Sequence, residues 1–256
     1  MDALFDPQTE RLDEINERLS LISLKSGLTF GTDSYLLSAF ARPSKSGVCV
    51  ELGGGTGVVS LLCASREKYR KIFSAEIQPY FASLIARNAA MNSLEDSVIP
   101  IPADVRELTA KDIGGECDSV ISNPPYMKKD SGLTNDSPEM NAARREENGT
   151  IAEFCAAAAR LLRFGGYFTA VYRPDRLAEI IVSLRHASLE PKRLVTVYPT
   201  AADKPCLILV EAKKGASEGI VLSRPLIIYE DKSTSRYTAD MAKIYDDFSL
   251  EHLFSR

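Results

Sequence analysis

The chain has 256 residues, of which 45% are hydrophobic and 26% charged, and its formal net charge is −4. These values are typical of a globular protein with one large domain, or one domain and a small appendage. No apolar run is long enough to cross a bilayer, and the acidic residues 1–14 do not resemble a secretory signal, which predicts a cytoplasmic protein. The negative charge argues against indiscriminate coating of nucleic acid. The two histidines lie far from any cysteine, and no cysteine pair has C-x-x-C spacing, so no metal site is expected.

Residues 1–45 are predicted to form an N-terminal extension made of a short helix, a hairpin and a second helix. The helical spacing of Leu12, Ile15 and Leu19 indicates the first helix. Apolar residues on both sides of Ser26-Gly27 indicate the hairpin, with Leu28 and Phe30 in its second strand. The second helix covers 35–40, with Thr32 or Asp33 as its cap.

Residues 46–215 alternate between strands and helices, which predicts an α/β fold. Such alternation gives a doubly wound, mostly parallel sheet, here of seven strands, with helices on both faces. Gly165-Gly166 is expected to end a helix, and the last two strands are expected to form a hairpin at one sheet edge. Residues 216–256 are predicted to be an irregular C-terminal tail. The expected strands cover 48–52, 71–76, 97–101, 117–122, 167–172, 194–198 and 206–211, and the expected helices cover 56–66, 80–91, 151–163 and 177–187.

Residues 51–57 read Glu-Leu-Gly-Gly-Gly-Thr-Gly and connect the first strand of this region to its first helix. The segment lacks the lysine of a P-loop and the third glycine of a dinucleotide fingerprint. Glycines let a ligand approach the backbone closely, and the carboxylate of Glu51 suits a cationic group better than a phosphate. A plain glycine-rich turn is the alternative.

Acidic residues follow the next two strands, at the sheet edge where ligands of parallel sheets bind. Glu76 can accept hydrogen bonds from both hydroxyls of a ribose. Asp104 can accept one from an adenine amine, or it is an ordinary loop acid. With Glu51 and the glycines, these residues describe a nucleoside ligand that has a positive charge and no phosphates. S-adenosylmethionine fits that description.

The sequence Asn123-Pro124-Pro125-Tyr126 follows the strand at 117–122. Proline cannot continue a buried strand, so the strand must end in a stiff turn that bears an amide and an aromatic ring. The Asn123 oxygen and the Pro124 carbonyl can accept hydrogen bonds from the two N–H groups of an exocyclic base amine. These hydrogen bonds would free the lone pair of the amine nitrogen. Tyr126 can stack on the base. The turn therefore indicates methylation of an amino nitrogen, and a purely structural rigid turn is the alternative.

With these two motifs, residues 48–211 resemble the class I S-adenosylmethionine-dependent methyltransferases of the Asn-Pro-Pro-Tyr subgroup. The segments 10–13, 30–37, 123–128 and 143–146 resemble the bacterial tRNA(Val) adenine-37 N6-methyltransferase family more closely. Members of that family often carry histidine where Arg145 stands, and aspartate is common where Glu51 stands.

This resemblance implies methylation of adenosine 37 in a valine tRNA, with the base flipped out of the anticodon loop into the pocket. From the residues themselves, no metal and no membrane are expected, and the oligomeric state stays open, a monomer included. The polar loop at 128–150 is expected to contact substrate. The basic pairs of the chain, including Arg173 with Arg176 and Lys213-Lys214, either form a local basic face or are solvated charges. The expected catalytic residues are Asn123, Pro124, Pro125 and Tyr126; the expected cofactor-binding residues are Glu51, Gly53, Gly55, Gly57, Glu76, Ile77, Asp104, Val105 and Asn123; and the expected RNA contacts are Lys128, Lys129, Arg144 and Arg145.

Three other functions fit the same residues. A ribosomal RNA base presents the same kind of amine. A protein glutamine amide offers the same NH2 geometry, although protein-glutamine N5-methyltransferases typically carry a larger helical N-terminal domain. An RNA-binding subunit with a vestigial methyltransferase fold would be expected to have lost one of the two motifs, and both are intact.

Overall fold

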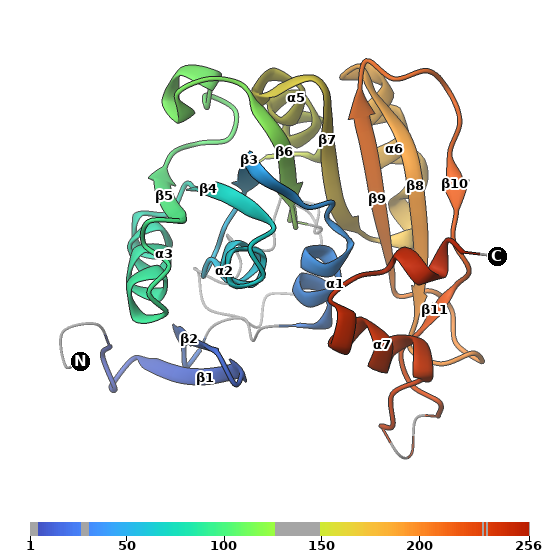
Figure 1. The fold of residues 1–256 in the computed structure, drawn as a ribbon, viewed down its shortest axis with the longest axis horizontal. Coiled ribbons are helices and arrows are strands. Elements are labelled where there is room, and N and C mark those ends of the chain that lie inside the picture. Colours follow the sequence, from blue (N-terminus) through green and yellow to red (C-terminus); the bar gives the residue numbers. More distant parts are fainter. Residues whose placement is uncertain (1–4, 27–30, 126–148, 232, 234, 256) are drawn as a thin grey trace, which may run out of the picture.

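The computed structural model of the chain describes residues 5–26, 31–125, 149–231, 233 and 235–255. In this part of the chain, the main sheet has nine strands in the order β10-β8-β9-β7-β6-β3-β4-β5, with β11 also paired to β8 (Figure 1). The strands from β5 to β7 are parallel, whereas β9 runs antiparallel between β7 and β8. The strands are β3 (Ser44–Leu52), β4 (Tyr69–Glu76), β5 (Val98–Pro102), β6 (Cys117–Ser122), β7 (Leu162–Tyr172), β8 (Leu189–Tyr198), β9 (Leu207–Lys214), β10 (Val221–Leu222) and β11 (Leu226–Ile227).

Helices cover both faces of the sheet, so each face has its own hydrophobic core. Alternate residues of β7 show the division, because Val171 belongs to one core and Phe168 and Tyr172 to the other. The first core contains residues of α1 (Thr32–Phe40), α2 (Val58–Ser65) and α3 (Pro79–Met91), and the second contains residues of η1 (Ala110–Ile113), α5 (Ile151–Leu161) and α6 (Leu177–His186), which follows η3 (Pro174–Arg176). The prediction of a doubly wound, mostly parallel α/β fold is confirmed. The seven main strands, β3 to β9, are those expected, and β10 and β11 add two residues each at one side.

The predicted first helix is wrong, because residues 10–24 form an antiparallel hairpin of β1 (Glu10–Asn16) and β2 (Leu19–Leu24). The turn between them is specified by Asn16, whose Oδ1 accepts hydrogen bonds from the backbone N–H groups of Arg18 and Leu19. Leu12 is exposed, so the helical spacing of the apolar residues did not correspond to a buried face. The strand at 21–24 was expected, but its partner precedes it in the chain; Leu28 and Phe30 lie outside the described residues.

The hairpin is attached to the rest of the molecule through α3. Asn88, fully buried, donates to the carbonyl oxygens of Ile22 and Thr56 and accepts from the Ile22 N–H. Arg87 forms two hydrogen bonds with the Glu10 carboxylate, at 2.7 and 2.9 Å. The same helix therefore fixes the hairpin and, through the Thr56 carbonyl, the glycine-rich segment that follows β3.

Two further boundaries differ from the sequence prediction. α5 ends at Leu161 and β7 begins at Leu162, so Gly165-Gly166 lies inside a strand and does not end the helix. A Cβ atom at Gly166 would lie 3.0 Å from the backbone oxygens of Asp118 and Arg163, which explains a glycine in this strand. β8 and β9 do pair as expected, but β9 lies inside the sheet, next to β7.

The sequence predicted an irregular tail after residue 215, but the segment after residue 220 forms regular elements and contributes to the first core. It contains β10, β11, α7 (Ala239–Asp247) and η4 (Glu251–Leu253). Met241, Ile244 and Phe248 recur at helical spacing and are buried. The ring of Tyr245 lies 4.6 Å from that of Tyr35 in α1, and Figure 1 shows α7 beside this helix. The division of the chain at residues 45 and 215 stays a prediction.

Candidate active site

The candidate site lies beyond the carboxyl ends of the parallel strands. Leu52 of β3 is paired with Ser122 of β6, so the segment that begins at Gly53 lies beside Asn123 on the neighbouring strand, about 5 Å away. The Ser122 hydroxyl donates to the Leu52 carbonyl at 2.8 Å and ties the two strand ends together. The N–H groups of Gly53 and Gly54 both donate to the Ala75 carbonyl of β4. Three strand ends thus converge on one small region, as the sequence predicted.

The glycine segment needs its glycines for two different reasons. Gly53, Gly55 and Gly57 have φ values of +75°, +53° and +83°, a region that favours glycine. A Cβ at Gly54 would lie 2.2 Å from the Ser74 hydroxyl, so the packing leaves no room for a side chain at this position. At Gly55 an added Cβ would meet no atom within 4 Å. The loop is therefore packed on its inner side and open at Gly55, the form expected of a cradle for a ligand.

Glu51 is buried at the end of β3, with 3% of its surface exposed. The hydroxyls of Ser60 and Ser74 both donate to its Oε2 atom, the second at 2.9 Å. Burial raises the pKa of Glu51 to about 7, although these hydroxyls stabilise the charged form. A carboxyl group with this pKa would gain charge when a cationic ligand binds nearby.

Glu76 is held in a fixed orientation beside the glycine segment. Its Oε2 accepts from the Gly55 N–H and its Oε1 from the Gln78 N–H, both at 2.9 Å. Burial raises the pKa of Glu76 against the effect of these N–H donors. Each carboxylate oxygen has more than one lone pair, so the residue retains the capacity to accept from ligand hydroxyls.

The three other residues expected to bind cofactor lie further along the same edge. Ile77 follows β4 and is partly exposed, whereas Val105 is buried in the second core. Asp104 forms an ion pair with Arg106, whose Nε lies 2.9 Å from both carboxylate oxygens. The Arg106 guanidinium lowers the pKa of Asp104. A ligand amine that used Asp104 would therefore share this carboxylate with Arg106.

Asn123 is oriented by a residue from the N-terminal region. Its Nδ2 donates to Oδ2 of Asp33 at 3.0 Å, a contact between positions 90 residues apart. Asp33 was expected as a possible helix cap, but α1 begins at Thr32 after Gly31, and Asp33 lies in the first turn. Because Asp33 takes the NH2 arm of the amide, the carbonyl arm is directed elsewhere. Pro124 is buried and Pro125 partly exposed, which stiffens the turn after β6.

The structure brings Glu51, Glu76, Asn123 and the glycines together at one edge of the sheet. The remaining predicted residues, Tyr126, Lys128, Lys129, Arg144 and Arg145, lie outside the described residues. The sequence reasoning did not find Asp33 as a partner of Asn123, or Ser60 and Ser74 as partners of Glu51. The only signal for Asp33 was its place in the segment 30–37, one of those that carried the family resemblance.

Among the described residues, no group of histidine, cysteine and acidic side chains could hold a metal, and no helix is long and apolar enough to span a membrane.

Comparison with known proteins agrees with this fold. Residues 39–131 match the family model described as the TRM5/TYW2 methyltransferase domain. Among solved structures, the fold is similar to a predicted O-methyltransferase from Agrobacterium tumefaciens, with a TM-score of 0.68, 20% identity and coverage of 85% of this chain and 97% of that one. It is also similar to M. jannaschii TYW2, solved in complex with AdoMet, with a TM-score of 0.56, 16% identity and coverage of 82% and 87%.

The fold, the glycine cradle between two carboxylates and these relatives define a class I, S-adenosylmethionine-dependent methyltransferase. Within that class, the chain resembles proteins named tRNA1(Val) (adenine(37)-N6)-methyltransferase. One from Porphyromonas gingivalis is 25% identical over 91% of this chain and 92% of its own, and one from Bacteroides fragilis is 28% identical over 89% and 93%.

Proposed function

We propose that this protein methylates N6 of an adenine in tRNA, adenosine 37 of tRNA(Val), in the cytoplasm. The hydrogen bond between Asn123 and Asp33 carries the proposal, because it orients a rigid amide beside the glycine cradle. The choice of substrate is supported by the names of the relatives, which match about nine tenths of the chain.

The chemistry of the proposal follows from the exocyclic amine of adenine. Its lone pair is delocalised into the ring, so the nitrogen is a weak nucleophile. The Asn123 side-chain oxygen and the Pro124 carbonyl would accept hydrogen bonds from its two N–H groups and favour a tetrahedral nitrogen. The prolines preorganise these acceptors, so little rearrangement is needed at reaction. When bound, S-adenosylmethionine supplies the electrophilic methyl group.

The cofactor residues would act by binding and orientation. Glu76, already fixed by the N–H groups of Gly55 and Gln78, would accept the ribose hydroxyls. Glu51 would favour the cationic end of the cofactor. Asp104 and Val105 would lie along the adenine of the cofactor, and Ile77 beside its ribose. For the RNA, we propose that Tyr126 stacks on the flipped base and that Lys128, Lys129, Arg144 and Arg145 contact phosphates.

The test is methyl transfer by Asn123→Ala. Labelled S-adenosylmethionine and total RNA from a strain that lacks this protein would be the substrates, with mass spectrometry of the nucleosides as the readout. We expect the wild type to form N6-methyladenosine in tRNA(Val), and the variant to be slower by about 100-fold or more, as when one preorganised hydrogen-bonding group is removed from an enzyme. Binding of the cofactor should stay largely intact, since Asn123 is only one of its expected contacts.

Gln8→Ala, which removes an exposed side-chain amide far from the site in sequence, provides a matched control and should retain full activity. Retention of most activity by Asn123→Ala would remove this amide from the mechanism. Methylation of a ribosomal RNA base or of a protein glutamine in place of tRNA would overturn the proposed substrate.

A further inference from the structure

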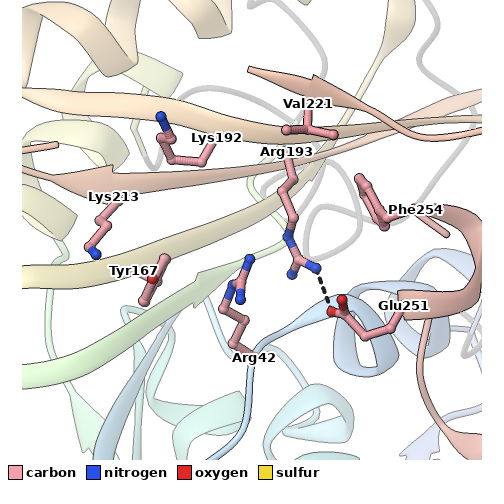
Figure 2. Close-up of a pocket in the computed structure, with 8 residues that line it drawn as sticks. All are labelled: Arg42, Tyr167, Lys192, Arg193, Lys213, Val221, Glu251 and Phe254. Atoms are coloured by element: carbon pink, nitrogen blue, oxygen red, sulfur yellow. Dashed lines mark hydrogen bonds and ion pairs between the residues drawn. The ribbon is translucent and has the colours of Figure 1, made fainter. Parts of the chain in front are cut away.

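A pocket lies at the amino ends of the parallel strands, at the opposite edge of the sheet from the candidate active site. Figure 2 shows the side chains that line it. Its Tyr167, in β7, is paired with Ser119 of β6, and Ser119 precedes Asn123 by four residues. Four residues of strand span about 13 Å, so the pocket is distinct from the methyl-transfer site. Its volume is about 380 Å³, and it is lined by Arg42, Tyr167, Lys192, Arg193, Lys213, Val221, Glu251 and Phe254.

The pocket carries an excess of positive charge. Four cationic side chains line it, and two carboxylates oppose them, Glu251 in the lining and the fully buried Glu211 beneath it. The local balance is therefore two positive charges, in a chain whose formal net charge is −4. A concave surface that gathers positive charge on a negatively charged protein favours an anionic ligand.

Arg193 gives this pocket a rigid floor. Its side chain is 6% exposed and forms two hydrogen bonds with the Glu211 carboxylate, at 2.9 and 2.7 Å. A third hydrogen bond joins it to Glu251, as Figure 2 shows. The guanidinium also lies over the rings of Phe40 and Phe254, 4.7 and 5.1 Å from their centroids. The pocket is thus built on a buried ionic network and is not a chance cluster of surface lysines.

Arg42 and Lys213 approach the ring of Tyr167 from opposite sides (Figure 2), with cationic groups 5.1 and 5.2 Å from its centroid. Among the described residues, Arg42 hydrogen-bonds to the Glu211 carboxylate through Nε alone, and the Lys213 amine has no hydrogen bond. The outer N–H groups of Arg42 and the Lys213 amine can therefore donate to a ligand. A guanidinium fork and an ammonium group both suit the oxygens of a phosphate.

We propose that this pocket binds a phosphate of the substrate RNA backbone, at a distance from the reacting base. The inference rests on the proposed function for the identity of the RNA. Lys213 belongs to a basic pair noted in the sequence, whereas another such pair, Arg173 and Arg176, forms ion pairs with Asp175 and Glu179. The pocket would add an anchor for the RNA strand that does not take part in methyl transfer.

The test compares Lys213→Glu with Lys111→Glu, which makes the same charge change at an exposed residue of η1, an element of the opposite core. Binding of tRNA to the full chain is measured over a range of salt concentrations, with binding of S-adenosylmethionine as a check on folding. We expect Lys213→Glu to weaken tRNA binding about tenfold and to reduce the slope of log K against log salt by about 0.7–0.9, the contribution of one phosphate. Lys111→Glu should change neither, and both variants should bind the cofactor like the wild type.

Equal behaviour of the two variants towards tRNA would overturn the proposal. Failure of the proposed function is distinguishable, because then the wild type itself would neither bind nor methylate tRNA. In that case calorimetric titration with inorganic phosphate decides: binding that is lost in Lys213→Glu and kept in Lys111→Glu would support a phosphate site, and no binding by the wild type would overturn it.

Discussion

At the scale of single residues, Asp33 orients the Asn123 amide by accepting a hydrogen bond from its Nδ2 group. We expect Asp33→Ala to slow methyl transfer by about 100-fold, since a small misplacement of a positioned group can cost that much. Cofactor affinity should change little. Asp33→Asn keeps an oxygen that can accept from Asn123, so it should recover part of the rate. Steady-state kinetics of the two variants check this; full activity of Asp33→Ala would show that Asn123 needs no such support.

Glu51 makes stability depend on pH in an unusual direction for a carboxyl group. Its pKa is about 7 in the folded chain and near 4.5 in an ordinary environment. The folded state therefore binds more protons between pH 4.5 and 7, so this residue favours folding most below pH 4.5, and the advantage is lost as pH rises to 7. The difference corresponds to about 3 kcal/mol.

Glu51→Gln removes this titration. Urea unfolding of both proteins at pH 5 and pH 8, without cofactor, should show that the wild type becomes less stable relative to the variant as pH rises. A constant difference between the two proteins across this range would contradict the assigned pKa.

The sequence was most informative where neighbouring residues act together. The glycine segment and the turn at Asn123 could be predicted because proline and glycine restrict the backbone locally. Asp33 could not be identified in the same way, because 90 residues separate it from Asn123. Likewise, the contact between Glu51 and Ser74 depends on the register between β3 and β4, which pairs these two residues.

At the scale of elements, the ionic network around Arg193 joins β8, β9 and η4. Glu211→Ala would leave the buried guanidinium of Arg193 without its principal partner. We expect a loss of about 3–5 kcal/mol in the free energy of unfolding, as when one member of a buried pair is removed. Glu218→Ala, which breaks an exposed ion pair with Arg185, should have little effect. Denaturant unfolding measures both; similar losses in the two variants would show that burial of the network is unimportant.

Elements with a regular pattern were predicted within a few residues, and those set by tertiary contacts were not. The first part of the hairpin is predicted as a helix because Leu12, Ile15 and Leu19 match helical spacing, whereas the turn at Asn16 decides the structure. In contrast, Met241, Ile244 and Phe248 did show the spacing of α7, and Thr238 caps this helix by accepting from the Met241 N–H. This helix could have been predicted from the same signals that located the others.

At the scale of the whole molecule, the C-terminal segment packs into the same core as α1 and α2. Lys68 illustrates this, because its buried amine donates to the carbonyl oxygens of Ser38, Ala39 and Ala41 at the end of α1. The ring of Phe248, after α7, lies over the same amine at 4.9 Å. The sequence could not show that these distant segments meet, since nothing local links Lys68 to Phe248.

The single side chain of Asn88 joins Ile22 in the hairpin to Thr56 in the glycine segment. The N-terminal extension is consequently not an interchangeable module that could be exchanged between methyltransferases of this class. A chimera with a foreign extension would have to preserve this asparagine and its partner strand, or else rebuild the support of the glycine segment.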